Sequence, residues 1–537
     1  MWGRSERLTA LGGGGLALAA LGAFVVLAIA KLVALGGWAA AAAVVTDPYI
    51  LRVLRFTLWQ AALSTLLSLA FAIPVARALA RQRHFPGRIW AVRLLAVPMG
   101  LPALIGAFGL IAVWGRQGVA NTALAALGLS EPVSIYGLTG ILLAHVFFNM
   151  PLACRFILIG LERIPGEYWL MSSSLGMRGR DIFRFIEWPV IRRILPGVAG
   201  LIFMLCATSF TLVLTLGGGP QATTLEVAIY QSLRFDFEPP RAVGLALMQI
   251  AVTAAILAVI ALFPAPDDRG VTLGKPVRRL DAGGAARLTD GLAIAAMLVF
   301  TLLPLGAVTV SGLRSDLAKL LGEPIFLTAT VTSLVLSLSA GLMAVAASLA
   351  IVRAIHAAEG GGLALRGFSS LLSASSALVL LVPPIVLATG WFLLLLPFGD
   401  ISRFAPFLVA AINAAMALPF VTRLIGPAWR EHRIRTARLA ASLGLTGWAR
   451  LRLVDWPGLR KPLLMGLSFA MALSLGDLGA VALFGSDNLM TLPWLIYSRI
   501  GNYRTADADG LALLLGLLCL ALTIAGTLPS ATEKNDR

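Results

Sequence analysis

The sequence is dominated by apolar runs that are long enough to cross a lipid bilayer. A hydrocarbon core about 30 Å thick is crossed by roughly 20 apolar residues in an α-helix. Runs of this length lie near residues 12–35, 54–76, 94–114, 136–160, 195–216, 243–263, 288–311, 327–352, 372–398, 404–425, 463–484 and 508–529. Because helices satisfy their own backbone hydrogen bonds in lipid, the runs predict an all-α polytopic membrane protein with about twelve transmembrane helices.

Charged residues are few and lie between the apolar runs. They make up 13% of the 537 residues and hydrophobic residues 58%, against about 25% and about 45–50% in ordinary soluble chains. The formal net charge is +17. A basic chain can bind nucleic acid, but here the Lys and Arg residues fall in short loops between spans, as membrane orientation signals do. We therefore expect contact with membrane lipid and no nucleic-acid partner.

The distribution of basic residues also predicts the topology. With a cytoplasmic N-terminus, most Lys and Arg residues fall in cytoplasmic loops, such as the arginine-rich loop from Arg77 to Arg93. The first apolar run follows Arg4 and Arg7 but is too long for the core of a signal peptide, so we interpret it as an uncleaved helix. Both termini are then expected in the cytoplasm.

The two halves of the chain repeat each other. At one fixed offset Pro151 matches Pro419, and the stretch from Ser174 to Arg193 matches that from Ser442 to Lys461. A polar, Gly- and Pro-rich segment separates the halves. We therefore divide the chain into a first six-span half (1–263), a cytoplasmic linker (264–287) and a second six-span half (288–537). An even number of spans in each half makes this a parallel repeat.

The repeated stretch lies in a polar cytoplasmic loop between the fourth and fifth spans of each half. It reads EYWLMSSSLGMRGRDIFRFIEWPVIRRILP in the first half and RTARLAASLGLTGWARLRLVDWPGLRKPLL in the second. In each copy we expect a helix of small residues, a sharp turn at Gly176 or Gly444, and a second amphipathic helix that Pro189 or Pro457 ends. Such a hairpin is suited to docking into a groove on a partner. The alternative is a hairpin whose arginines contact anionic lipid.

The loop carries a resemblance to a known family. Small residues, then Leu-Gly, then a hydrophobic-acid-Trp-Pro run resemble the coupling loop of bacterial ABC importer permeases, with its leading glutamate kept as Glu167 but replaced by Arg435 in the second copy. Longer runs resemble the permeases of thiamine and thiamine pyrophosphate importers, namely YGLTGILLAHVFFNMPLACR, FRFIEWPVIRR, LIFMLCATSF, LGGGPQATTLEVAIYQSL, VLATGWFLLL and TLPWLIY.

The resemblance implies a permease subunit of the bacterial inner membrane that is not itself an enzyme. Its expected partners are two copies of an ABC ATPase and a periplasmic thiamine-binding protein, and its expected cargo is thiamine and thiamine phosphates. The ATPase contacts are expected at Glu167, Ser174, Leu175, Gly176, Glu187 and Pro189 in the first loop and at Ser442, Leu443, Gly444, Asp455 and Pro457 in the second.

The sequence itself shows no ATP site. A phosphate-binding loop needs the pattern G-x-x-x-x-G-K-[ST], and the nearest candidate, Gly274-Lys275, is followed by Pro276. Three cysteines and four histidines show no metal-ligand spacing, so we expect neither a metal site nor a cofactor. Energy for transport would then come from the ATPase partner.

Polar residues inside the apolar runs are candidates for the substrate path. Asp477 is the conspicuous charge and is either a contact for the thiazolium cation of thiamine or a structural acid that binds neighbouring helices. Its counterpart in the first half is Ser209, so we expect no symmetric ring of acids. Pro102 and Pro384 are expected to kink corresponding helices. His145, Asn149 and Asn413 are expected to form interhelical hydrogen bonds.

Three other functions are alternatives to this interpretation. A fused permease for ferric iron or another small solute would share the coupling loops. A secondary transporter would be expected to carry several intramembrane charges for ion coupling, whereas Asp477 stands nearly alone. An enzyme would need converging acids, histidines or metal ligands.

Overall fold

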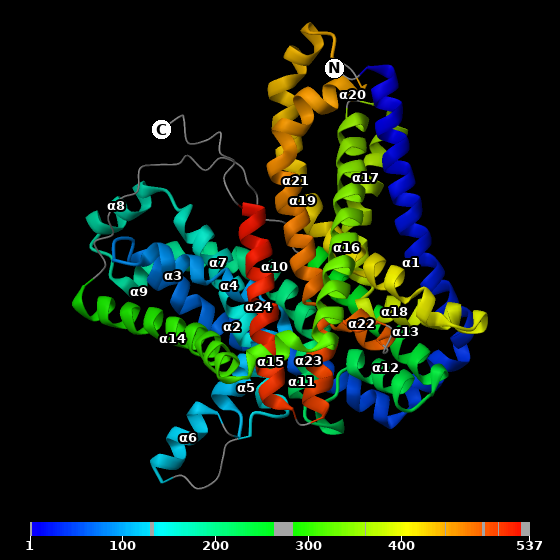
Figure 1. Cartoon of the computed structure of the whole chain (residues 1–537). Coiled ribbons are helices and arrows are strands. Elements are labelled where there is room, and N and C mark those ends of the chain that lie inside the picture. Colours follow the sequence, from blue (N-terminus) through cyan, green and yellow to red (C-terminus); the bar gives the residue numbers. More distant parts are fainter. Residues whose placement is uncertain are drawn as a thin grey trace. The chain divides into compact units, whose positions relative to one another are not determined.

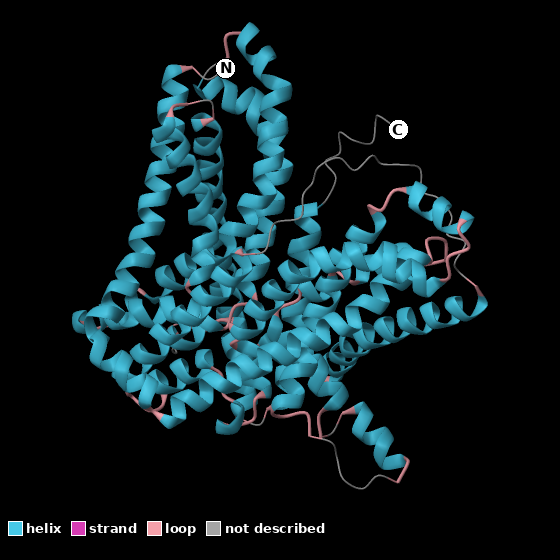
Figure 2. Cartoon of the chain, turned by 180° about the vertical axis from the view of Figure 1, so that it is seen from behind, coloured by secondary structure: helices cyan, strands magenta, loops and turns pink. Residues whose placement is uncertain are grey.

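The computed structural model describes residues 3–116, 118–128, 134–262, 283–359, 361–445, 447–485, 489–502 and 504–527. Within these ranges the secondary structure is helical and contains no strand (Figures 1 and 2). The predicted all-α class is confirmed. Residues 264–282 of the predicted linker lie outside the described ranges, and residues 284–287 already belong to a helix.

The described helices group into two compact units. The first-half unit comprises Asp47–Val227 and Ala251–Ser311, and the second-half unit comprises Met1–Thr46, Ala228–Ile250 and Gly312–Arg537. Each unit therefore contains most of one sequence half together with the first long helix of the other half. The predicted division of the sequence into two halves joined by a linker remains a prediction.

The first-half unit is built around α2, α7 and α10, which pack against one another. Its helices are α2 (Pro48–Arg81), α3 (Arg88–Leu94), α4 (Val97–Gly100), α5 (Ala103–Trp114), α6 (Val119–Ala126), α7 (Leu138–Glu162), α8 (Gly166–Ser174), α9 (Gly179–Ile182), α10 (Trp188–Ala207), α11 (Thr211–Leu216) and most of α14 (Gly284–Arg314). Two further helices, α12 (Leu225–Arg234) and α13 (Pro239–Ala261), have residues in both units.

The second-half unit is built around α16, α19 and α21, which also pack against one another. Its helices are α1 (Arg4–Thr46), α15 (Leu317–Gly322), α16 (Pro324–Ala358), α17 (Leu363–Leu378), α18 (Pro384–Leu395), α19 (Ala405–Ser442), α20 (Gly447–Arg450), α21 (Trp456–Leu475), α22 (Gly479–Phe484), α23 (Leu492–Gly501) and α24 (Thr505–Thr527). Helices α2, α7 and α10 thus correspond to α16, α19 and α21.

Small residues allow the central helices to approach closely. The buried side of α16 carries Ala329, Ser333, Ala340, Ala344 and Ser348, which recur at helical spacing. In lipid no hydrophobic force draws helices together, so close van der Waals packing through small side chains drives their association. Hydroxyl groups add interhelical hydrogen bonds, such as the one between Thr422 and Ser348 at 3.0 Å.

Helix α1 packs against α16 and α18 of the second-half unit. The indole Nε1 of Trp391 on α18 donates a hydrogen bond to the carbonyl of Phe24 at 3.0 Å, and the two rings stack with centroids 5.1 Å apart. Near the N-terminus Arg7 Nε donates to the carbonyl of Ala357 at 2.9 Å. The first span of the chain is therefore fixed to helices from the second half of the sequence.

Two of the predicted spans in the second half are interrupted. The run at 372–398 forms α17, a short 3₁₀ turn and α18, because Pro383 and Pro384 lack the N–H groups that would continue the helix. The run at 463–484 is divided between α21 and α22 at Gly476 and Asp477. Among the described residues ten helical stretches have the length and composition of a membrane span, fewer than the about twelve expected from apolar length alone.

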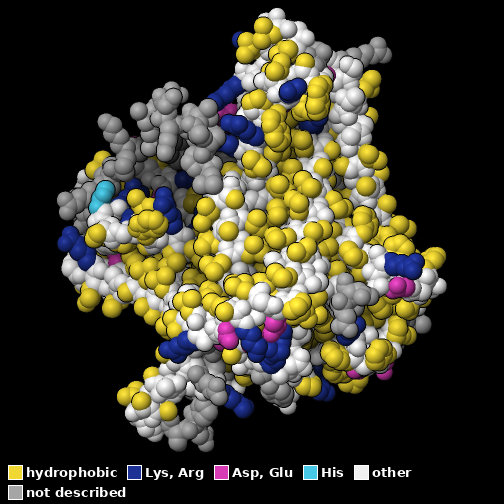
Figure 3. Space-filling model, viewed as in Figure 1, with side chains coloured by type: hydrophobic (Ala, Val, Ile, Leu, Met, Phe, Trp, Pro, Cys, Tyr) yellow, Lys and Arg dark blue, Asp and Glu magenta, His cyan; other side chains and the backbone are white. Residues whose placement is uncertain are grey.

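Apolar side chains cover the outer sides of the long helices. Figure 3 shows them over α19, α21 and α24, where Phe420, Leu464, Phe469, Leu517 and Leu520 are exposed. In water so many exposed large apolar side chains would cause aggregation. The surface is that of a protein surrounded by lipid.

Candidate functional site

Both predicted turns in the repeated loops have the same backbone conformation. Gly176 has φ +63° and Gly444 has φ +61°, values that a residue with a Cβ adopts only at a cost. The helix before each turn ends in the same way, since Met177 N donates to Ser172 O and Leu445 N donates to Ala440 O. The predicted sharp turns are confirmed.

The helix before the turn differs between the two copies. In the first loop α7 ends at Glu162 and α8 begins at Gly166, whereas in the second loop α19 runs without interruption to Ser442. Pro165 explains the break, because a proline inside the helix would remove a hydrogen bond and clash with the preceding turn. The second copy has Arg433 at this position, which continues the helix.

The prolines after the turn do not end a helix, and this expectation is wrong. Pro189 and Pro457 lie in the first turn of α10 and α21. Each follows a five-residue π-helical turn, Phe183–Glu187 in the first copy and Leu451–Asp455 in the second. A wider π turn accommodates a residue that lacks an N–H and crowds the carbonyl four residues earlier. The chain therefore continues from each loop directly into the fifth span.

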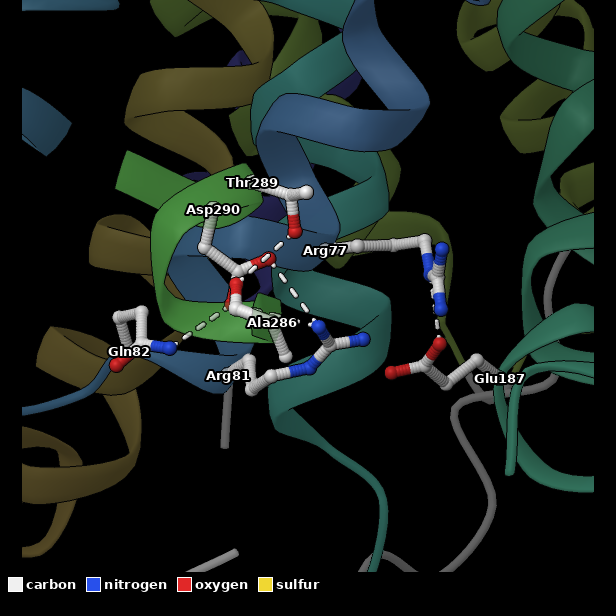
Figure 4. A network of polar contacts seen from close by, with 7 residues as sticks. All are labelled: Arg77, Arg81, Gln82, Glu187, Ala286, Thr289 and Asp290. Atoms are coloured by element: carbon white, nitrogen blue, oxygen red, sulfur yellow. Dashed lines mark hydrogen bonds and ion pairs between the residues drawn. The ribbon is translucent and has the colours of Figure 1, made fainter. Parts of the chain in front are cut away.

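The last residue of the first π turn is a buried acid held by an arginine. Glu187 is fully buried, and its Oε2 accepts a hydrogen bond from Arg77 Nε on α2 at 2.7 Å (Figure 4). The guanidinium of Arg77 also lies over the ring of Phe183, 4.1 Å from its centroid. A single arginine thus contacts both ends of the π turn.

A second polar contact joins the same end of α2 to α14. Asp290 accepts hydrogen bonds from Arg81 Nη1 at 3.2 Å and from Gln82 Nε2 at 2.8 Å (Figure 4). The side chains of Arg81 and Asp290 are almost fully buried, so the pair is shielded from water. The first long helix of the second sequence half is thereby fixed near the base of the first loop.

The second π turn also ends in a buried acid, but with different partners. Asp455 Oδ1 lies 3.0 Å from His432 Nε2 on α19, and Oδ2 lies 3.6 Å from Arg450 Nε on α20. Arg450 also forms an ion pair with Glu6 on α1 at 3.6 Å. The acid is common to both copies, whereas the residues that hold it are not.

Exposed apolar side chains occupy the same positions in both loops. Met171 and Leu175 in the first copy correspond to Leu439 and Leu443 in the second, and all four are more than half exposed. The other predicted contact residues differ in exposure. Exposed positions are Glu167, Ser174, Gly176, Ser442, Gly444 and Pro457, whereas Glu187 and Asp455 are buried and Pro189 is partly buried.

The predicted interhelical hydrogen bonds are confirmed in both units. In the first-half unit Ser64 Oγ lies 2.9 Å from His145 Nδ1, and Asn149 Nδ2 donates to Cys206 Sγ at 3.3 Å. In the second-half unit Asn413 Nδ2 donates to Ser474 Oγ at 2.9 Å. These bonds join the fourth span of each half to its neighbours.

Asp477 lies at the interruption between α21 and α22. Its Oδ1 accepts a hydrogen bond from Gly479 N at 3.0 Å and its Oδ2 accepts one from Ala480 N at 3.3 Å, so the carboxylate caps the short helix α22. It also lines a cavity of about 10 Å³, the room that one water molecule needs. The cavity residues are Ser333, Leu336, Val409, Asn413, Ser474, Leu475, Asp477, Val481, Thr491 and Pro493.

The remaining path candidates lie at corresponding interruptions of helices. Pro102 precedes α5 and Pro384 begins α18, so the predicted kinks are complete breaks. Ser209 lies between α10 and α11, as Asp477 lies between α21 and α22. Each half therefore has an interrupted third span and an interrupted fifth span.

Several residues of these sites carried no recognisable signal in the sequence. Arg77 stands among other arginines at the end of an apolar run, where orientation in the membrane already accounts for it. His432 and Arg450 have no counterpart of the same type in the first copy. The π turns also have no sequence pattern of their own, although a Trp-Pro pair follows both of them.

Comparison with known proteins gives relatives along nearly the whole chain. The thiamine transport system permease protein ThiP of Brucella abortus (strain 2308) is 50% identical over 528 residues, which are 97% of this chain and 95% of the relative. The Escherichia coli (strain K12) protein of the same name is 44% identical over 495 residues, 92% of each chain.

A more distant relative covers less of the chain. The molybdenum transport system permease protein ModB of Mycobacterium bovis (strain ATCC BAA-935 / AF2122/97) is 30% identical over 224 residues, which are 40% of this chain and 80% of the relative. No family model matches the chain.

The long apolar helices and the permease relatives define the class as a multi-pass membrane permease of a transport system. Within that class the chain belongs to the family of thiamine transport system permease proteins, because relatives of that name match it at 44–50% identity over more than nine tenths of its length. The thiamine family is thereby favoured over the alternative of a permease for another small solute.

Proposed function

We propose that this chain forms the membrane pathway of an ATP-driven importer that moves thiamine and thiamine phosphates from the periplasm to the cytoplasm. The observation that carries the proposal is the 50% identity over 97% of the chain to a protein named as a thiamine transport permease. The chain would supply the pathway, and ATP would be hydrolysed on a separate subunit.

The proposed orientation has both termini in the cytoplasm of a bacterium and the chain in its inner membrane. The distribution of Lys and Arg residues between alternate loops supports this orientation. The two repeated loops then lie on the cytoplasmic side, where an ATPase is available. The segment between α11 and α13 lies on the outer side, where a thiamine-binding protein would deliver its cargo.

The two loops are the proposed docking sites for two copies of an ABC ATPase. Three features support this role: a glycine turn of the same conformation in each copy, exposed apolar side chains at matching positions, and a buried acid beneath each loop. Exposed large apolar side chains outside the bilayer indicate a protein interface rather than a surface that faces water. Leu175 and Leu443 are the proposed central contacts.

Transport would follow from two conformations of the permease that ATP binding favours differently. When the ATPase pair closes on ATP, the docked loops would move with it. Because each π turn continues directly into α10 or α21, a displaced loop would move the fifth span of its half. The interruptions at Ser209 and Asp477 would let the outer parts of those spans move separately.

The experiment that tests the function is uptake by the reconstituted complex. The chain, its ATPase and the thiamine-binding protein are placed in proteoliposomes, and entry of radiolabelled thiamine is measured with ATP inside. We expect uptake that requires ATP and the binding protein. Vesicles that hydrolyse ATP but accumulate no thiamine would refute the proposed cargo.

The stoichiometry gives an independent test. Because one chain already carries both loops, we expect one permease chain and two ATPase chains in the purified complex. Native mass measurement of the detergent-solubilised complex gives this ratio directly. A particle with two permease chains would contradict the assignment of both docking sites to one chain.

A further inference from the structure

The polar cavity around Asp477 has a counterpart among the residues of the first-half unit. In the second-half unit Ser333 Oγ accepts a hydrogen bond from Leu492 N at 2.8 Å, at the start of α23. In the first-half unit Thr57 Oγ1 accepts one from Leu225 N at 3.0 Å, at the start of α12. A hydroxyl on the second span of each half thus holds the helix that follows the fifth span.

The remaining cavity residues follow the same repeat. The runs TTLEVAIY (223–230) and MTLPWLIY (490–497) align Thr224 with Thr491. The repeat of the fourth and fifth spans aligns His145 with Asn413 and Cys206 with Ser474. Each of these first-half residues is buried, as are its partners in the second half.

The acid in this arrangement has changed its position between the halves. Asp477 aligns with Ser209, which is neutral, but Pro493 of the cavity aligns with Glu226. One half therefore carries its acid at the interruption of the fifth span, and the other carries it at the first turn of the following helix. The expectation from sequence compared Asp477 with Ser209 alone and missed this exchange.

Glu226 is a buried acid with an unsatisfied side-chain oxygen among the described residues. Its side chain is 1% exposed, and Oε1 has no hydrogen-bond partner among the described residues. No Lys, Arg or His in the described part of the chain forms an ion pair with it. A buried carboxylate is costly unless a cation, a hydrogen-bond donor or a proton compensates it.

Neighbouring polar atoms are unsatisfied as well. Thr224 Oγ1, two residues before Glu226, is buried and has no partner among the described residues. Gln60, one turn along α2 from Thr57, uses its Nε2 to bond the carbonyl of Cys206 at 2.9 Å and leaves its buried Oε1 without a partner in the same part of the structure. These acceptors favour a ligand that donates hydrogen bonds or carries positive charge.

We propose that Glu226 is a second carboxylate that binds an organic cation on its way through the permease, as the first-half counterpart of Asp477. The proposal rests on the proposed function, because thiamine carries a permanent thiazolium cation and an amino group that can donate hydrogen bonds. In the proposed orientation Glu226 lies toward the outer side, so it meets the cation after release from the binding protein.

The test compares charge-removing and charge-keeping variants of the reconstituted complex. Glu226→Gln keeps the size of the side chain and removes the charge, Glu226→Asp keeps the charge, and Glu238→Gln makes the same chemical change at an exposed acid of the same segment. We expect Glu226→Gln to lower the ratio of maximal uptake rate to KM for thiamine about tenfold or more. Glu226→Asp should recover part of the loss, and Glu238→Gln should match the wild type.

A second readout separates cation binding from a structural role. ATP hydrolysis stimulated by empty binding protein should be unchanged in Glu226→Gln, because the loops and their partners are untouched. Wild-type uptake by Glu226→Gln would overturn the inference, as would a loss that Glu226→Asp does not reduce. If Glu226→Gln fails to assemble, a normal KM in Glu226→Asp also overturns it, since the shortened acid must bind the cation less well.

The outcomes that refute the proposed function differ from those that refute the role of Glu226. A wild-type complex that imports no thiamine refutes that function, whereas a wild-type complex that imports thiamine beside an unimpaired Glu226→Gln variant refutes only the role of Glu226.

Discussion

Arg77 Nε donates a hydrogen bond to Glu187 Oε2 at 2.7 Å, and the carboxylate that accepts it is completely buried. The acid of the repeated loop therefore faces inward, toward α2, and its exposed neighbours face outward. Asp455 repeats this arrangement with His432 and Arg450. We infer that the two acids position the loops, and that Leu175 and Leu443 provide the contact with the proposed ATPase partner.

The first prediction concerns the loss of Arg77. Arg77→Met removes the cation and leaves Glu187 buried without its charged partner, which costs about 3 kcal/mol for a pair of this kind. We expect a lower melting temperature of the purified chain in detergent and weaker association with the ATPase. Arg184→Met is the matched control, because Arg184 lies on the same π turn but is exposed. Equal stability of the two variants would contradict a positioning role for Arg77.

The second prediction concerns the backbone at the turn. Gly176→Ala places a Cβ on a residue with φ +63°, which costs about 1–2 kcal/mol locally. Because a Cβ there would meet no other atom, the whole effect comes from the backbone conformation. We expect normal membrane insertion but a weaker ATPase complex, measured by co-purification.

Gly179→Ala provides the comparison for that experiment. Gly179 lies in the same loop, has open space around its Cβ position and does not have positive φ. It should therefore bind the ATPase as the wild type does. If Gly176→Ala also binds normally, the left-handed turn is not required for docking.

The sequence predicted well what depends on periodicity and local chemistry. Apolar length predicted the long helices, the repeat predicted matching turns at Gly176 and Gly444, and isolated polar residues predicted the bonds of His145, Asn149 and Asn413. The helices and turns follow from preferences that residues show within their own segment. The bonds were predictable because a polar side chain on an apolar helix needs a hydrogen-bond partner on some neighbouring helix.

The features that were missed depend on contacts between distant parts of the chain. Nothing local indicates that Arg77 pairs with Glu187, since 110 positions separate them. The predicted role of the loop prolines was wrong for two reasons. Pro is usually a helix breaker, and the π turn that accommodates Pro189 has no separate sequence pattern. The relation between Asp477 and Glu226 was missed because the sequence comparison of the two halves covered the fifth span alone. Glu226 lies on the helix that follows this span.

The third prediction concerns the close approach of α21 to His432. A Cβ at Gly458 would overlap the ring of His432, whose Nε2 contacts Asp455. Gly458→Ala should therefore displace the histidine and lower the melting temperature, although alanine is the better helix former by about 1 kcal/mol. Gly197→Ala on α10 has no such neighbour and should leave stability unchanged or raise it. A gain in stability at both positions would show that the contact can relax without loss.

The last prediction separates the two roles that Asp477 can have. Its carboxylate caps α22 through Gly479 N and Ala480 N, and it also lines the polar cavity with Asn413 and Ser474. Asp477→Asn keeps one oxygen acceptor for the cap and removes the charge, whereas Asp477→Ala removes both. Loss of a cap costs about 1 kcal/mol, so Asp477→Ala should lower the melting temperature more than Asp477→Asn does.

We expect thiamine uptake to depend on the negative charge at position 477 and not on the melting temperature of the variant. If the carboxylate meets the thiazolium cation, Asp477→Asn slows thiamine uptake in an assembled complex about as much as Asp477→Ala, since both lack the negative charge. If the acid only caps α22, uptake falls in proportion to stability, and Asp477→Asn transports nearly as well as the wild type. Measuring the melting temperature and the thiamine uptake of both variants in the same preparations distinguishes these outcomes, and wild-type uptake by a correctly assembled Asp477→Asn complex would assign the residue to structure alone.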